Sequence, residues 1–214
     1  PGDSTCDLSS GTGTSGSPYL LSTEQDLFEM VDCMDASTSN NFFKLSNSIH
    51  VNSPWTTFDL TSDNANGAGF DGDNHIISGI ENPSGDGGLF DNIERALVKD
   101  LFFEVGAVSG TNTGGLAETV RFGSTLSNVH VRASATITGS NYVGGVAAFI
   151  ESSTVTDVSF VSSASVSGQG RAGGIAAQII DSTMGKLSVV SDVSSANARA
   201  GGIAGVARVQ PTTE

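Results

Sequence analysis

The 214-residue sequence contains few basic residues and no long hydrophobic run. Lys and Arg together number 9, against 23 Asp and Glu, so the formal net charge is −14. Binding to nucleic acid or to an anionic membrane surface depends on basic residues, so this balance excludes both partners. No apolar stretch approaches the roughly 18 residues that span a bilayer, so we expect no transmembrane segment in this sequence. A well-solvated surface explains most of the acidity, and a neutral glycan or a positively charged partner is compatible with it.

The sequence also lacks an apolar leader and a capped end. It opens on Pro1 with a polar stretch, which is typical of a trimmed or processed chain. Residues 1–18 are rich in Gly, Ser and Thr, and we interpret them as a flexible N-terminal arm. The last strand pattern, GGIAGVARV, has no capping element after it, and an open edge invites pairing. We therefore expect residues 210–214 to be a tail and the native protein to continue beyond Glu214.

Cysteine is scarce, because Cys6 and Cys33 are the only two. No His or third Cys lies near them, so they do not form a zinc site. We interpret them as a disulfide that ties the N-terminal arm to the segment around Cys33, with two free thiols as the alternative. Disulfides persist in oxidising compartments, so the pair predicts an extracellular or periplasmic protein.

Paired glycines recur from residue 87 onward and form the strongest pattern in the sequence. The pairs are Gly87–Gly88, Gly114–Gly115, Gly144–Gly145, Gly173–Gly174 and Gly201–Gly202. Successive pairs lie 27, 30, 29 and 28 residues apart, and such a period is the signature of a repeat architecture. Leucine-rich repeats share this period, but their L-x-x-L-x-L-x-x-N pattern is absent.

Aliphatic residues repeat in the same register as the glycines. Each pair precedes an aliphatic residue, and two further columns follow: Leu97, Leu126, Val155, Met184 and Leu101, Val129, Val158, Leu187. Stretches such as TVTDVSFVSSASVS alternate apolar and polar residues, which is strand periodicity. Three short strands and three corners use roughly 28 residues. We predict an all-β fold, a parallel β-solenoid (β-helix) of triangular coils, with the paired glycines at structural corners where backbones approach closely or φ is positive.

The segment before the repeats has a different pattern, and we predict that residues 19–85 form an N-terminal cap. STEQDLFEMVDCMD predicts a helix over residues 23–33, with Thr23 as its N-terminal cap. Leu27, Phe28 and Val31 would form its apolar face. Terminal units of a repeat stack need a polar outer surface, so this helix is expected to cover the first coil. Residues 86–209 then form the solenoid proper.

Several motifs together resemble the GLUG-repeat family. They are YLLSTEQDLFEMV, FFKLSNSIHV, FDGDNHIISGI, GGLFDNI and the later GGLA, GGVA and GGIA steps, which span about residues 19–209. The family occurs in bacterial surface and secreted proteins, including adhesin-like chains and regions attached to IgA-cleaving metallopeptidases. The resemblance implies a β-solenoid stalk or display module and supplies no catalytic motif.

Catalytic carboxylates on a solenoid would be expected in one column of adjacent coils, because glycoside hydrolysis needs two acids across a groove. The predicted outward column Asp100, Asn128, Asp157, Lys186 holds only two acids, and they are not in adjacent coils. A lyase would need Arg or Lys beside a calcium site, but the arginines at 121, 132, 171 and 199 are scattered without matching acidic clusters. The sequence therefore predicts that the protein is not an enzyme.

Candidate metal and cofactor sites are weak. Asp63, Asp71 and Asp73 lie in an Asx-rich stretch that could hold calcium, although the EF-hand order is not met and turn formation is the alternative. The three histidines, His50, His75 and His130, lie in separate segments and form no recognisable catalytic or metal-binding motif. We expect no cofactor, and calcium is the one weak candidate.

Three function hypotheses remain open. The first is a non-catalytic extracellular module on a bacterial surface, an adhesin-like stalk or display scaffold whose partner is a surface glycan or protein. The second is a carbohydrate-binding or carbohydrate-active β-helix. The third is an ice-binding face, because the third strand places Ser109, Thr138, Ser167 and Ser194 in one outward column, although threonine occurs there in only one coil.

Overall fold

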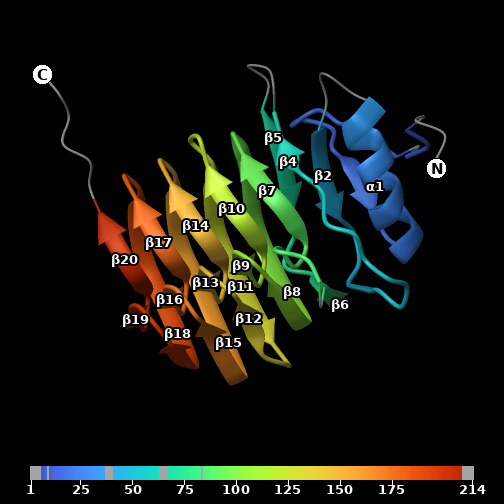
Figure 1. Cartoon of the computed structure of the whole chain (residues 1–214). Coiled ribbons are helices and arrows are strands. Elements are labelled where there is room, and N and C mark those ends of the chain that lie inside the picture. Colours follow the sequence, from blue (N-terminus) through green and yellow to red (C-terminus); the bar gives the residue numbers. More distant parts are fainter. Residues whose placement is uncertain (1–5, 9, 37–40, 63–66, 83, 209–214) are drawn as a thin grey trace, which may run out of the picture.

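The computed structural model describes residues 6–8, 10–36, 41–62, 67–82 and 84–208, and it forms a β-solenoid with one helix (Figure 1). The helix is α1, Glu24–Ala36. The strands before the repeats are β1 Tyr19–Leu21, β2 Asn41–Leu45, β3 Ile49–His50, β4 Leu60–Thr61, β5 Ala68–Asp71 and β6 Ile76–Asn82. The repeats contain β7 Phe90–Glu94, β8 Ala96–Gly110, β9 Thr113–Gly114, β10 Ala117–Arg121, β11 Thr125–Ala133, β12 Ile137–Gly139, β13 Val143–Gly144, β14 Ala147–Glu151, β15 Thr154–Gly168, β16 Ala172–Gly173, β17 Ala176–Ile180, β18 Thr183–Ser195, β19 Ala200–Gly201 and β20 Ala204–Arg208.

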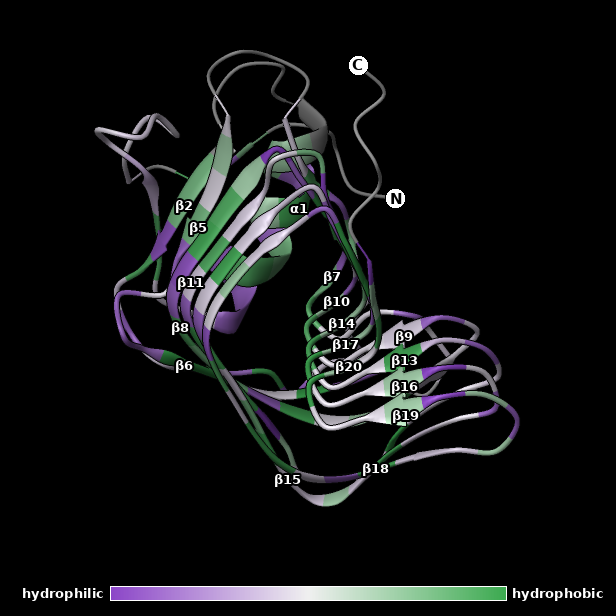
Figure 2. Cartoon of the chain, turned by 90° about the vertical axis from the view of Figure 1, so that its left-hand side faces the viewer, coloured by the Kyte–Doolittle hydropathy of each residue, from purple (hydrophilic) through white to green (hydrophobic). Residues whose placement is uncertain are grey.

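Three parallel sheets run along the stack, and each repeat coil contributes to all three. The main sheet contains β1, β2, β5, β8, β11, β15 and β18, with β3, β6 and β12 beside them. The second sheet has the order β4-β7-β10-β14-β17-β20, and the third sheet has the order β9-β13-β16-β19. Viewed along the stack, the second and third sheets meet at an inward bend, which we call the elbow (Figure 2). The predicted β-solenoid is therefore confirmed, with one side of each coil folded inward.

Aliphatic columns run through the interior as predicted, with one correction. One column pairs in register along the main sheet and consists of Leu101, Val129, Val158 and Leu187. The aliphatic residues that follow the glycine pairs form another column, and backbone hydrogen bonds join each of them to the next coil. The other column begins at Val98, not at Leu97, because Leu126 pairs with Val98. Leu97 instead pairs with Thr125 and lines a surface depression beside Phe42. The assignment of Leu97 to the core was therefore wrong by one residue.

A left-handed residue in each coil explains why the register was misread. Asp100, Asn128, Asp157 and Lys186 all have φ between 50° and 57°. Each of these four residues lies two positions after the inward residue of one column and one position before the inward residue of the next column. Two residues therefore separate consecutive inward positions, whereas a regular strand has one. A bulge residue in the left-handed region absorbs the extra residue, and Asp and Asn tolerate that conformation best.

The first predicted reason for the paired glycines, close approach of backbones, is confirmed. A Cβ on Gly114 would lie 1.8 Å from the carbonyl oxygen of Ala117, and one on Gly145 would lie 2.2 Å from that of Gly174. The other predicted reason, a positive φ, does not apply, because none of the paired glycines has one. The first glycine of a pair therefore lets the chain bend tightly within its own coil, and the second lets the backbones of adjacent coils approach at the elbow.

Helix α1 closes the N-terminal end of the stack (Figure 1). Thr23 caps it as predicted: the Asp26 amide donates to Thr23 Oγ1 (3.2 Å), and Asp26 Oδ2 accepts from the Ser22 and Thr23 amides. The buried face consists of Leu27, Met30 and Cys33, whereas the predicted Phe28 and Val31 are only half-buried. The described residues contain no helix long and apolar enough to cross a membrane.

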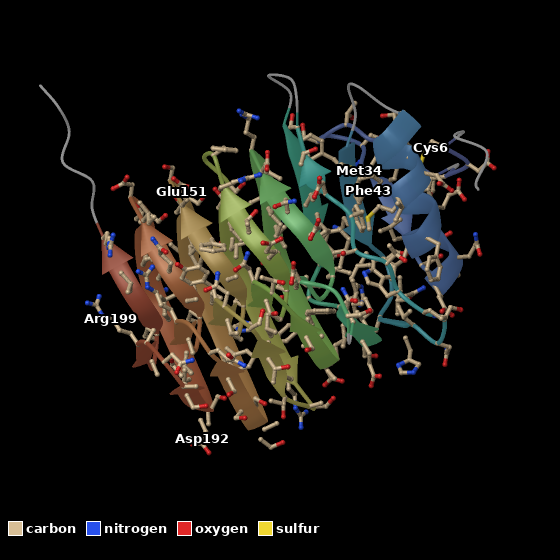
Figure 3. All side chains as sticks on the ribbon, viewed as in Figure 1. Cys6, Met34, Phe43, Glu151, Asp192 and Arg199 are labelled. Carbon is tan, nitrogen blue, oxygen red and sulfur yellow. A yellow bond between two sulfur atoms is a disulfide. The ribbon has the colours of Figure 1, made fainter. Side chains whose placement is uncertain are left out.

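The predicted disulfide is present, because Cys6 and Cys33 are bonded to each other beside α1 (Figure 3). Hydrogen-bonded sheets cross the predicted boundary at residues 85 and 86, since β4 pairs with β7, and β5 and β6 pair with β8. At the other end, near Asp192 and Arg199, inward residues of the last described coil are exposed, among them Ile203. The predicted tail, residues 210–214, and residues 1–5 and 9 of the arm lie outside the described residues.

Candidate functional site

The outer face of the main sheet carries two ladders of side chains that the solenoid register brings together. One ladder is Ile76, Phe102, His130, Ser159 and Ser188, one residue from each successive coil. The neighbouring ladder is Glu104, Arg132, Val161 and Val190. Adjacent rungs lie about 4.8 Å apart, as strands do in any sheet. Residues far apart in the sequence therefore form one continuous surface.

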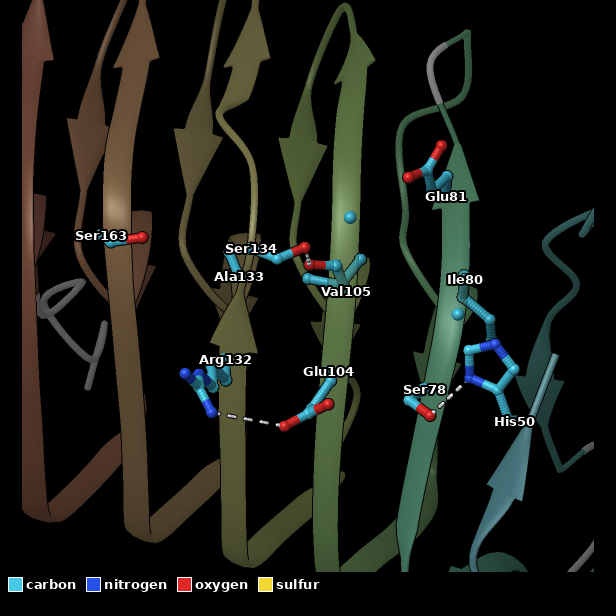
Figure 4. A pocket seen from close by; sticks show the side chains of 12 residues that line it. His50, Ser78, Ile80, Glu81, Glu104, Val105, Arg132, Ala133, Ser134 and Ser163 are labelled. Carbon is cyan, nitrogen blue, oxygen red and sulfur yellow. Dashed lines mark hydrogen bonds and ion pairs between the residues drawn. The ribbon is translucent and has the colours of Figure 1, made fainter. Parts of the chain in front are cut away.

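Two adjoining depressions lie along these ladders. The larger, of about 470 Å³, is lined by residues that include His50, Glu81, Glu104 and Arg132 (Figure 4). The other, of about 350 Å³, is lined by residues that include Ile76, Phe102 and His130. Both include Glu104 and Arg132, so we treat them as one feature and call it the outer groove.

One side of the outer groove is an apolar ledge. Phe102 and His130 stack with ring centroids 4.9 Å apart and planes tilted by 32°. Ile76 and Phe102, together with Val161 of the neighbouring ladder, keep 38–41% of their surface exposed and lie around the same depression. His130 is fixed in place, because its Nδ1 lies 2.7 Å from Ser159 Oγ and its Nε2 lies 3.0 Å from Asn128 Oδ1.

The other side of the groove is polar. Arg132 and Glu104 form an ion pair at 3.6 Å, and Arg132 remains 72% exposed, so its guanidinium can still reach a ligand. His50 Nδ1 lies 3.0 Å from Ser78 Oγ (Figure 4). Glu81 lies over Gly106, where a Cβ would come within 2.5 Å of Glu81 Cγ. The missing side chain at position 106 therefore leaves the space that Glu81 occupies.

Sequence reasoning missed a second polar cluster, at the elbow. Asp91 and Glu118 occupy equivalent positions in adjacent coils, between the register pairs Phe90–Ala117 and Asn92–Thr119. Burial raises the pKa of both carboxyls, and the neighbouring acid Asp86 raises both further. Asn112 donates to Glu118 (3.2 Å), which partly offsets the shift. The available signal was the acid at the third position after two successive glycine pairs, GGLFD and GGLAE.

The predicted outward column at the bulge is present but forms a structural network. Asn128 donates to Asp100 over 2.8 Å, and this bond, together with Lys99, lowers the pKa of Asp100 although burial opposes the shift. Asp157 lies 4.0 Å from Lys186. These side chains pair with one another on the surface, and each occupies the left-handed bulge position described above.

Two of the weak calcium candidates form ion pairs with lysines. Asp71 lies 2.7 Å from Lys99, and Asp73 lies 3.1 Å from Lys44, while Asp63 lies outside the described residues. Within the described part of the chain, no cluster of three or more His, Cys, Asp or Glu is arranged to hold a metal ion. Asp71 and Asp73 therefore stabilise the turn between β5 and β6 through ion pairs with neighbouring strands.

The remaining arginines and histidines singled out in the sequence have separate roles, except for two histidines. Arg121 Nε donates to Glu94 (2.6 Å), and Arg171 donates to Gln178 (2.7 Å) while lying over the Tyr142 ring. His75 closes its turn through its backbone amide, whereas His50 and His130 both reach the outer groove, which their separation in sequence did not suggest. The outward column Ser109, Thr138, Ser167, Ser194 does form, with a single threonine.

Comparison with known proteins gives little further guidance. No family model matches the chain, and no curated protein matches it either. Among solved structures, the chain is similar to the crystal structure of "a putative immunoglobulin A1 protease" from Bacteroides ovatus, at 15% identity and a TM-score of 0.48. The alignment covers 95% of this chain and 89% of that chain. A likeness this distant carries no argument about function, so membership of the GLUG-repeat family stays a prediction.

Proposed function

We propose that this chain is a non-catalytic extracellular module of a bacterial surface or secreted protein. It acts as an adhesin-like scaffold that displays a ligand-binding surface, namely the outer groove. The observation that carries the proposal is the groove itself, an exposed apolar ledge beside a polar wall on a sheet whose central strands are paired on both sides. Exposed apolar side chains rimmed by polar ones are a common feature of ligand-binding grooves.

Rigidity supports a display role. Each coil is hydrogen-bonded to the next along three sheets, so the ladders on the outer face are held in fixed register. A surface that is already ordered loses little conformational entropy when a ligand binds. The scaffold therefore favours recognition by a preformed face over recognition by a folding loop.

The disulfide supports an extracellular setting. Cys6 and Cys33 are bonded to each other, and among the described residues no cysteine is free. Such bonds persist in secreted and periplasmic proteins and are rare in the cytosol. The bond therefore supports our proposal that the module lies outside the cytoplasm.

One observation favours a second candidate, a carbohydrate-active enzyme. Asp91 and Glu118 lie in adjacent coils, and their raised pKa values would suit a general acid. Neighbouring coils are about 4.8 Å apart, which is close to the carboxylate separation of retaining glycosidases. Neither residue lines the outer groove, so the two candidates place function on different faces of the solenoid.

Binding and turnover assays separate the two candidates. Fluorescently labelled protein would be applied to surfaces coated with mucin, fibronectin, cellulose or chitin, and released reducing ends would be assayed in parallel. We expect saturable binding to at least one surface without product release, and weaker binding by Arg132→Ala. Glu118→Gln should bind like the parent protein. Product release that disappears in Glu118→Gln would instead establish the enzyme, and binding unaffected by every groove variant would refute the display role.

A further inference from the structure

We propose that the outer groove binds a neutral glycan chain that lies along the solenoid axis, across the strands. This inference rests on the proposed display function and names its ligand class. It depends on three properties of the groove: the hydrogen-bonding state of its backbone, the composition of its walls and its charge.

The central strands of the groove offer no free edge to a ligand. Strand β8 pairs with β6 and β11, β11 also pairs with β15, and β15 also pairs with β18. A peptide that adds as an extra strand needs a free sheet edge, and these strands offer none. Recognition on these strands therefore depends mainly on their side chains.

The apolar ledge suits the C–H face of a sugar ring. Phe102 is 38% exposed and is held at a fixed tilt by His130, which is itself anchored by Ser159 and Asn128. A sugar ring combines such an apolar face with a rim of hydroxyls. An immobilised aromatic surface beside Ile76 and Val161 can pack against that face with little loss of side-chain entropy.

The polar wall suits the hydroxyl rim. Glu81 and Glu104 supply hydrogen-bond acceptors, Arg132 supplies donors, and Ser78, Ser134 and Ser163 supply both. These groups adjoin the ledge, because Glu104 and Arg132 line both depressions. A ligand in the groove would therefore contact apolar and polar groups at once, as a sugar chain requires.

The charge of the groove selects against anionic ligands. Two carboxylates, Glu81 and Glu104, lie near one guanidinium, Arg132, and the whole chain has a net charge of −14. A uronate, a sulfated glycan or a phosphate chain would meet repulsion both locally and at a distance. From Ile76 to Ser159 the ladder crosses three coil spacings, about 14 Å, which accommodates a short run of sugar residues.

Calorimetric titration with soluble oligosaccharides tests the proposal. The probes are cellohexaose, chitohexaose and mannohexaose as neutral chains, and hexagalacturonate as the anionic comparison. We expect binding to at least one neutral chain, weakened roughly tenfold or more by Phe102→Ala, as loss of an aromatic anchor usually does. Phe102→Trp should retain binding.

Phe122→Ala is the matched control for Phe102→Ala. Phe122 is also exposed, at 46% against 38% for Phe102, but it lies against Arg95 and Arg121 at another corner, away from the groove. It should leave binding unchanged, and thermal unfolding of each variant shows whether it is folded. Equal losses in Phe102→Ala and Phe122→Ala would overturn the proposal.

The outcomes separate failure of this inference from failure of the proposed function. If Phe102→Ala and Arg132→Ala abolish binding to fibronectin while no glycan binds, the display function stands and the glycan class is wrong. Stronger binding of hexagalacturonate than of the neutral chains overturns the neutral class. If no surface and no oligosaccharide is bound in a groove-dependent way, both proposals are refuted.

Discussion

Individual residues in this chain are constrained mainly by the backbone of neighbouring coils. The bulge ladder shows this clearly, because Asp100, Asn128 and Asp157 share a left-handed backbone that Lys186 also adopts. Asp and Asn favour that conformation, whereas a lysine there is uncommon. The residue types in this column therefore reflect backbone geometry more than chemistry.

Replacing Thr113 with Val should stabilise the protein by about 1 kcal/mol, because its hydroxyl is fully buried without a hydrogen-bond partner. The next coil already has Val143 in this position. Thr119→Val is the control and should destabilise the protein, because Thr119 Oγ1 donates a hydrogen bond to Asn92 that the variant loses. Urea unfolding measures both changes, and a destabilised Thr113→Val would contradict this reading of the core.

Gly145→Ala should destabilise the protein far more than Gly202→Ala, although both glycines are the second of their pair. A Cβ at position 145 would lie 2.2 Å from the Gly174 carbonyl oxygen, whereas a Cβ at 202 would meet nothing within 4 Å. Thermal unfolding of the two variants gives the comparison. Equal losses would show that the glycines are required for a reason other than coil-to-coil contact.

At the scale of the strand, the sequence predicted the inward face well and the outward face poorly. The column that contains Leu101 and Val129 follows from alternation and period, because burial imposes a repeating apolar type. Leu97 was misplaced because a left-handed bulge residue leaves no apolar signal. The outer groove was not predicted, since Phe102, His130 and Glu81 share no motif and meet only through the coil register and the position of β6.

The elbow acids were missed for a related reason. Asp91 and Glu118 continue as Ala148, Ala177 and Gly205 in later coils, so the column is acidic in only two of its members. A search for repeated residue types therefore passes over it. Aligning every position after the glycine pair, including the non-repeating ones, would have placed the two acids side by side.

Glu118→Gln should raise the melting temperature at neutral pH. Burial and the neighbouring acids Asp86 and Asp91 raise the pKa of Glu118 above 4.5, so its ionised form is less favourable in the folded state than in the unfolded state. This penalty is complete above the folded pKa and is relieved as the pH falls through that value. The gain from Gln should therefore shrink as the pH approaches 4.5.

Asp91→Asn should act in the same direction, because burial and the neighbouring acids Asp59 and Asp86 also raise the pKa of Asp91. The two carboxyls are neighbours, so the double variant should gain less than the sum of the single gains. Melting temperatures measured from pH 4 to pH 8 test this. A gain from Glu118→Gln that is independent of pH would contradict the electrostatic explanation.

On the scale of the whole molecule, the N-terminal end of the stack is closed by a cap whose stability depends on pH. Helix α1 and the disulfide close the N-terminal end, and the capping of α1 depends on an ionised Asp26. Burial alone would raise the pKa of Asp26, but hydrogen bonds from Ser22 and Thr23 outweigh it and lower the pKa. This contribution to stability is present above the ordinary pKa of 3.8 and is lost as the pH falls through the lower folded value.

Reduction of the disulfide should destabilise the protein by about 3 kcal/mol, because Cys6 and Cys33 close a loop with a sequence separation of 27 residues. Thermal unfolding with and without reductant measures the effect. The Cys6→Ser variant should unfold at the lower temperature and should not respond to reductant. An unchanged midpoint for the parent protein would show that the bond contributes nothing to the cap.

The most direct test of this account is a pair of spin-label distances along the ladder that forms the groove. Labels would be placed at Ile76 and Ser159 in one variant and at Ile76 and Ser188 in another, with the disulfide left oxidised. Ile76 and Ser188 are four coil spacings apart, about 19 Å, and Ser159 is one spacing closer. We predict that the second distance exceeds the first by about 5 Å. Equal distances, or a difference of more than about twice that spacing, would contradict the stacked-coil structure and remove the outer groove with it.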